Sequence, residues 1–278
     1  MTVLVFTLLI WIVSVIVGFL GALTGLGGGA LIVPLLTLVF GVDLHYAMGA
    51  SLVSVIATSS GAASAYLREG YTNLRLGMFL QIATTVGAVA GGFLVTRVST
   101  QSIGIIFGAV LLYSAYLSGR DQPVRTIPAR SDELAVKLKL NGSYPTEQGP
   151  QAYQVDHEIA GFGVMFVAGV LSSLLGIGSG ALKVLGMDQV MKIPFKVSTT
   201  TSNFMIGVTA ATGASLYLRA GYIEPRLTMP VMLGGLLGSM LGARVLARAN
   251  PRILRLVFAV IIVVMGIEMI YNAVTGRL

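Results

Sequence analysis

The 278-residue chain contains no cysteine and only two histidines, His45 and His157. The absence of cysteine excludes disulfides, thiol catalysis, iron–sulfur clusters and cysteine-based zinc sites. Two histidines are too few for a histidine-rich transition-metal site. The sequence therefore predicts neither a metal nor another cofactor.

Charge is also scarce, because Asp, Glu, Lys and Arg make up 10% of the residues while hydrophobic residues make up 55%. Soluble globular domains carry roughly 25% charged residues, and disordered chains need high charge with low hydrophobicity, so both classes are excluded. The 35 glycines follow no collagen period. Small residues let helices approach closely in lipid. We therefore expect an integral membrane protein surrounded by membrane lipids.

The net charge of +7 does not indicate a nucleic-acid partner, because the basic residues are spread over short loops. The positive-inside rule explains them better. The first apolar stretch lacks a basic region before it and a small-residue cleavage site after it. We expect it to be the first membrane segment and not a signal peptide.

One polar segment, 119–157, interrupts the apolar pattern and holds ten of the 29 charged residues and four prolines. We predict a solvated cytoplasmic linker, with one or two amphipathic turns at 131–140, between membrane halves 1–118 and 158–278. The halves repeat each other: residues 18–117 placed over 169–268, at an offset of 151, give 26 identities. Internal duplication is typical of transporters whose substrate lies between the repeats.

The hydropathy pattern predicts an all-α, polytopic membrane helix bundle. The stretch 3–40 carries no charge and as one helix would extend to about 57 Å, longer than the hydrocarbon core. It must break, and Gly25 to Gly29 mark the place. The expected helices are 3–22, 30–41, 45–66, 76–97, 102–118, 158–175, 181–191, 196–218, 227–248 and 253–272.

Two topologies are compatible with this pattern. If each glycine run is a hairpin tip and the second half is inverted, 14 of the 18 Lys and Arg residues lie on one side of the membrane and 4 on the other. With four crossings in each half and parallel halves they divide 10 to 8. The positive-inside rule favours inverted repeats with both termini outside, although the matched Tyr-Leu-Arg loops would then face opposite compartments.

The glycine runs are the strongest candidate site. Glycine tolerates positive φ, and each run opens into a helix whose N-terminal N–H groups favour an anion. Close helix packing is the alternative explanation for these glycines. The candidate substrate-binding residues here are Gly25, Gly27, Gly28, Gly29, Gly176, Gly178, Ser179 and Gly180.

Lys183 follows the second glycine run, where the first half has Ile32. An ionisable residue inside a membrane segment is costly and usually functional, so Lys183 is a candidate for attracting an anion. The alternatives are that it snorkels to the interface or pairs with Asp188. The helices that follow add Ser51, Thr201, Ser202 and Asn203 as candidate hydrogen-bond donors, although Ser and Thr also hold membrane helices together.

These residues resemble the sulfite exporter TauE/SafE family, also called the toluene-sulfonate uptake permease family. The resemblance rests on the run Gly25 to Pro34, on Gly49-Ala50-Ser51 and on Gly176 to Gly180, and it covers both halves but not the linker. It implies transport of sulfite, sulfoacetate or related organosulfur anions across the prokaryotic inner membrane. Ser179, where a third glycine is usual, and Lys183 break the symmetry between the halves.

We therefore expect a transporter that exports a small anion, most simply sulfite or an organosulfonate, by alternating access between two repeats. No catalytic triad, Walker loop or metal-ligand cluster is present, so we expect no enzyme. An anion channel of the same fold, a non-transporting membrane scaffold and a cation transporter are the alternatives. The sequence leaves open whether the chain acts alone or as a homo-oligomer.

Overall fold

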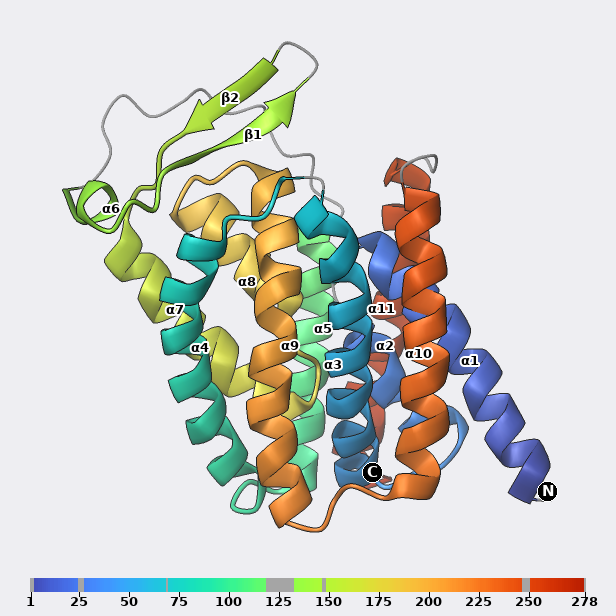
Figure 1. The fold of residues 1–278 in the computed structure, drawn as a ribbon. Coiled ribbons are helices and arrows are strands. Elements are labelled where there is room, and N and C mark those ends of the chain that lie inside the picture. The colour runs from blue at the N-terminus through green and yellow to red at the C-terminus, as the bar shows by residue number, and fades with distance from the viewer. Residues whose placement is uncertain are drawn as a thin grey trace.

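The computed structural model describes residues 3–24, 28–68, 70–118, 133–146, 149–246 and 251–277. Gly25 and Gly27, two of the candidate site residues, lie outside these ranges. The described chain is a helix bundle with a small two-stranded sheet at one end (Figure 1). Within these ranges, four helices are long and apolar enough to cross a membrane, at Leu4–Ala22, Leu44–Ala63, Leu74–Val95 and Glu158–Leu175.

The first half contains five helices and one π-helical turn. These are α1 (Val3–Thr24), α2 (Gly29–Pro34), the π turn η1 (Leu35–Val39), α3 (Leu44–Arg68), α4 (Leu74–Val95) and α5 (Thr100–Ser118). The second half contains α7 (Glu158–Leu175), α8 (Gly180–Leu185), the π turn η2 (Gly186–Val190), α9 (Phe195–Arg219), α10 (Pro225–Leu246) and α11 (Pro251–Val274). The ten helices predicted from the sequence are confirmed, each within two residues of its predicted ends, when α2 is counted together with η1 and α8 together with η2.

The offset of 151 found in the sequence also relates the elements of the structure. Adding 151 to the bounds of α2, η1, α3 and α4 gives the bounds of α8, η2, α9 and α10. The helix pairs follow the same rule, because α1 packs along α10 as α7 packs along α4. In Figure 1, α3 begins at the lower end of the bundle whereas α9 begins at the upper end.

Glycines bring the paired helices together at matching positions. A Cβ on Gly87 of α4 would lie 2.1 Å from the Phe166 carbonyl oxygen of α7. In the repeated pair, a Cβ on Gly238 of α10 would lie 2.0 Å from the Val15 carbonyl oxygen of α1. Only a residue without a side chain permits this approach, so part of the high glycine content serves helix packing, as expected in lipid.

The linker is more ordered than the predicted solvated loop. It contains α6 (Glu133–Lys137) and a hairpin of β1 (Gly142–Thr146) and β2 (Gly149–Tyr153). Its apolar residues Leu140, Tyr153 and Val155 are buried in a cluster with residues of α4, α7 and α9. The hairpin and this burial were not predicted, whereas α6 falls within the one or two amphipathic turns predicted at 131–140. Residues 119–132 lie outside the described ranges.

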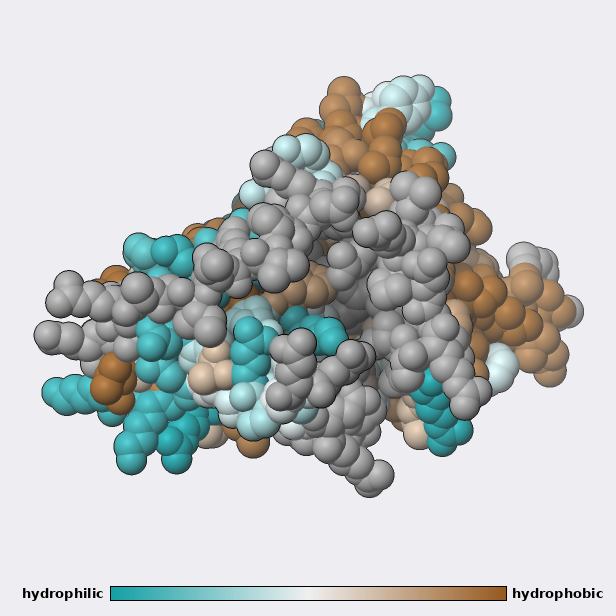
Figure 2. All heavy atoms as spheres, turned by 90° about the horizontal axis from the view of Figure 1, so that it is seen from above, coloured by the Kyte–Doolittle hydropathy of each residue, from teal (hydrophilic) through white to brown (hydrophobic). Residues whose placement is uncertain are grey.

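Asn73 connects this linker to the bundle. Its side-chain amide donates to the Leu140 carbonyl and to the Tyr153 hydroxyl, each at 2.7 Å, while its Oδ1 accepts from the Leu76 N–H and caps α4. Burial raises the pKa of the Tyr153 hydroxyl, and the hydrogen bond with Asn73 lowers it in part. Seen from this end, hydrophilic residues gather at the lower left of the view, and hydrophobic residues are seen chiefly at its top and right (Figure 2).

Candidate functional site

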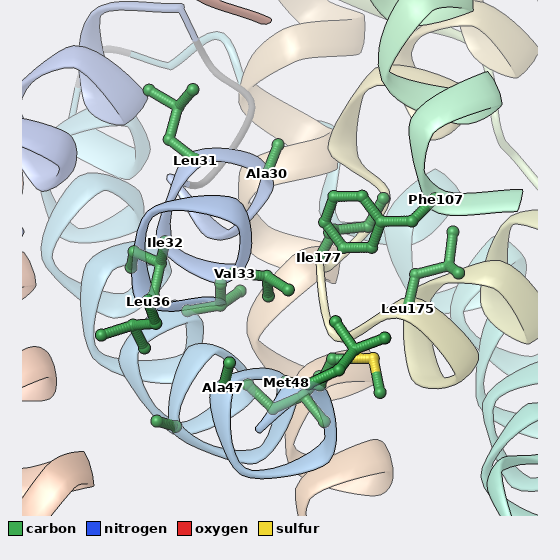
Figure 3. Close-up of a cluster of buried hydrophobic side chains, with 14 of the residues drawn as sticks. Ala30, Leu31, Ile32, Val33, Leu36, Ala47, Met48, Phe107, Leu175 and Ile177 are labelled. Carbon is green, nitrogen blue, oxygen red and sulfur yellow. The ribbon is translucent and has the colours of Figure 1, made fainter. Parts of the chain in front are cut away.

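The two glycine-rich turns meet in the middle of the bundle. The Ser51 hydroxyl of α3 lies 3.3 Å from the Gly29 carbonyl oxygen and 2.7 Å from the Gly176 carbonyl oxygen, so one side chain contacts both turns. A Cβ on Gly29 would lie 3.0 Å from the Ile177 carbonyl oxygen. Figure 3 shows Ile177 of the second turn in the same buried cluster as Ala30 and Val33 of α2.

Ser202 repeats the first of these contacts in the second half. Its hydroxyl donates to the Gly180 carbonyl at 3.3 Å, the same distance as between Ser51 and Gly29. Both serines are fully buried. The structure therefore places the two serines beside the turns, where each hydroxyl donates to the backbone of a turn.

The residue before each short helix has left-handed backbone. Gly28 has φ 73° before α2, and Ser179 has φ 42° at the matching position before α8. A side chain in this conformation costs roughly 1–2 kcal/mol. The Ser179 hydroxyl donates to the Ala168 carbonyl of α7, which holds the turn against that helix and offsets part of the cost.

Lys183 is fully buried in α8, at 0% exposure. Its ammonium donates to the Thr209 hydroxyl of α9 at 2.7 Å. The Gln81 amide of α4 donates to the same oxygen at 3.1 Å and to Thr85 at 2.9 Å, and the Thr209 hydroxyl donates to the Met205 carbonyl at 2.9 Å. Three helices, α4, α8 and α9, thus converge on one polar cluster inside the bundle.

Neither structural alternative for Lys183 describes its position. A snorkelling lysine would expose its ammonium, but this one is buried. The ion pairs that the structure records among the described residues are His45–Asp43 and Lys192–Asp156, and Lys183 belongs to neither. Asp188 accepts a hydrogen bond from the Gln189 side chain at 2.8 Å. Lys183 is therefore a fully buried lysine that pairs with no described carboxylate.

Thr201 and Asn203 lie on α9 but differ in their surroundings. Thr201 is fully buried, and its hydroxyl accepts from the Asn73 N–H at 3.1 Å, which places it beside the start of α4 and the linker. Asn203 is 3% exposed, and its Nδ2 has no hydrogen-bond partner among the residues that the structure describes. Asn203 thus retains donor capacity inside the bundle, whereas the Thr201 hydroxyl is engaged at the start of α4.

The sequence analysis missed Gln81, Thr84 and Thr85. Thr84 lies 3.3 Å from Thr209, and its hydroxyl also contacts the Gln81 carbonyl at 3.0 Å. Comparison of the halves could have found these residues, because the matching positions are Met232, Gly235 and Leu236. Apart from Arg75 at its start, α4 has polar or charged side chains at Gln81, Thr84 and Thr85 before the small residues of its second half.

Two spaces lie near these residues. A cavity of about 10 Å³, room for one water molecule, lies between the two turns and α5 and α11, lined in part by Ala30, Ser114 and Ser179. A groove of about 430 Å³ runs along the outer side of α4 and α9, with Gln81 and Thr85 among its mainly apolar lining. The described site is therefore closed around Lys183 in this conformation.

Comparison with known proteins gives a consistent result. The family model described as sulfite exporter TauE/SafE matches residues 10–269. The probable membrane transporter protein YunE of Bacillus subtilis is 24% identical over 95% of this chain and 97% of its own length. The probable membrane transporter protein MJ0441 of Methanocaldococcus jannaschii is 27% identical over 94% of each chain. No solved structure matches the chain significantly.

Proposed function

The chain belongs to the sulfite exporter TauE/SafE family of membrane transporters, and from this premise we propose that it moves a small anion, sulfite or an organosulfonate, across the cell membrane. The observation that supports an anionic substrate is the burial of Lys183 without a described counter-ion. An ammonium buried without a counter-ion is expensive, and a bound anion would offset that cost directly.

The proposed binding site lies where the two turns meet. An ammonium has three N–H donors, and Thr209 accepts one of them, so Lys183 retains donors for substrate oxygens. Asn203 and the turn residues Gly25, Gly27, Gly28, Gly29, Gly176, Gly178, Ser179 and Gly180 would complete the site, with Ser51 and Ser202 holding the turns in place.

The proposed mechanism is alternating access between inverted repeats. The opposite directions of α3 and α9 in Figure 1 and the repeated packing of α1–α10 and α7–α4 support this topology. Short broken helices at the centre of two repeats are typical of such transporters, in which one repeat moves against the other around the bound substrate. We propose no enzymatic activity.

Flux into liposomes containing the purified protein tests this proposal. Sulfite, an organosulfonate, sulfate, chloride and a sodium salt of an impermeant anion would each be offered. Saturable sulfite or sulfonate flux that persists in excess chloride supports the transporter. Flux that grows linearly with concentration would indicate an anion channel, sodium flux would indicate a cation transporter, and no flux by folded protein would favour a scaffold.

A further inference from the structure

The two halves carry different residues at the positions of Lys183 and Gln81 in the polar cluster, although the backbone repeats. The residues matching Lys183, Gln81 and Thr209 are Ile32, Met232 and Thr58. Thr58 is buried, and its hydroxyl donates to the Val55 carbonyl of its own helix at 3.2 Å. The duplication thus supplies two copies of one scaffold. Only the second copy has a lysine at this position, and Thr209 and Gln81 contact it or its partner.

We propose that Thr209 and Gln81 are positioning residues for the substrate, which they serve by fixing the Lys183 ammonium, so that the anion binds asymmetrically in the second half. The inference rests on the proposed function and adds two residues to it. Lys has a long flexible side chain with three rotatable donors, and it loses rotamer freedom only where a partner holds it.

The hydrogen bonds at Thr209 define the direction of the remaining donors. The Thr209 oxygen accepts from Lys183 and from Gln81, which uses both of its lone pairs, while its proton is shared between the Met205 carbonyl and the Thr84 hydroxyl. Gln81 fixes the threonine from α4, and Thr85 fixes Gln81 in turn. The ammonium therefore meets a fully occupied hydroxyl on one side, and its free N–H groups must point elsewhere.

The first-half threonine provides a matched control. Thr209→Val removes the acceptor for the ammonium, and Thr58→Val makes the same change at the repeated position, where the hydroxyl bonds to its own helix. Thr209→Ser restores the hydroxyl. Gln81→Met introduces the residue that the other half has at this position, and tests the same cluster from α4.

The experiment measures the half-saturating sulfite concentration and the maximal flux of each variant in liposomes. We expect Thr209→Val to raise half-saturation about tenfold or more, the usual effect of losing a hydrogen bond to a charged group. Maximal flux should stay within about twofold. Thr209→Ser and Thr58→Val should resemble the wild type, and Gln81→Met should raise half-saturation by a smaller factor.

Equal effects of Thr209→Val and Thr58→Val, or a Thr209→Ser variant as impaired as Thr209→Val, would overturn the inference. If Thr209→Val does not fold, Gln81→Met decides the question, because a wild-type half-saturating concentration in that variant contradicts a positioning role for this cluster. Lys183→Ala separates this inference from the proposed function. If Lys183→Ala loses sulfite binding while Thr209→Val keeps the wild-type half-saturating concentration, only the positioning role of Thr209 is refuted. If Lys183→Ala itself keeps the wild-type half-saturating concentration, the role of the lysine is refuted.

Discussion

The glycine contacts between α4 and α7 allow a prediction with a magnitude taken from the structure. An alanine at position 87 would place its Cβ 2.1 Å from the Phe166 carbonyl oxygen, and real Cβ atoms essentially never come closer than 3.0 Å to a neighbour. The helices would have to separate by about 0.9 Å. Backbone shifts of this kind cost about 1–3 kcal/mol, so we expect Gly87→Ala to lower the unfolding free energy by that amount.

Two further alanine variants give this prediction its controls. Gly238→Ala should destabilise the protein as much as Gly87→Ala, because its Cβ would lie 2.0 Å from the Val15 carbonyl oxygen in the repeated contact. Gly163→Ala on α7 meets no atom within 4 Å and gains helix propensity, so it should be neutral or stabilising by about 0.5–1 kcal/mol.

Thermal unfolding of the purified variants in one detergent measures these differences. A change of 1 kcal/mol shifts the melting temperature of a chain of this size by roughly 2–4 °C. We expect Gly87→Ala and Gly238→Ala to melt several degrees below Gly163→Ala. Equal melting temperatures for all three variants would refute the packing argument, because these glycine contacts would then not set how closely the paired helices approach.

Two further predictions concern the turns and the linker. Ser51→Ala removes a hydroxyl whose one proton is shared between the Gly29 and Gly176 carbonyls, 2.7 Å from the latter, and should cost about 1–3 kcal/mol, more than Ser202→Ala, whose hydroxyl makes one contact at 3.3 Å; equal melting temperatures would contradict this difference. Asn73→Ala removes the cap of α4 and two bonds to the linker, so it should lower the melting temperature more than Tyr153→Phe, which leaves the cap intact. Faster proteolysis of the linker in Asn73→Ala than in Tyr153→Phe would provide a second measurement, and indistinguishable digestion would argue against the attachment.

Much of the fold could be predicted from the sequence because hydropathy and duplication act over many residues. The break after α1 followed from the length of an uncharged stretch, and the matching helix bounds followed from one offset. The π turns η1 and η2 could not be predicted in this way. They depend on the local hydrogen-bond register, for example Phe40 N–H to Leu35 carbonyl, and occur whether Pro34 or Leu185 precedes them.

The site was predictable in part for a related physical reason. Lys183 was identifiable because a charge inside an apolar segment is costly wherever its helix lies. Its partners were not, because Gln81 lies on a helix of the other half and is brought to Thr209 only by tertiary packing. The ordered linker was missed for the same reason, since Leu140 and Tyr153 are buried by contact with distant helices.

The central claim is that the buried ammonium of Lys183 binds the transported anion. Sulfite flux into liposomes by Lys183→Ala, compared with Lys196→Ala, tests it most directly, because Lys196 is exposed at the start of α9 and its removal changes the net charge equally. The account predicts that saturable flux is lost, or needs at least about tenfold more sulfite, in Lys183→Ala, and is retained in Lys196→Ala. Equal flux in the two variants, at the same half-saturating concentration, would contradict it.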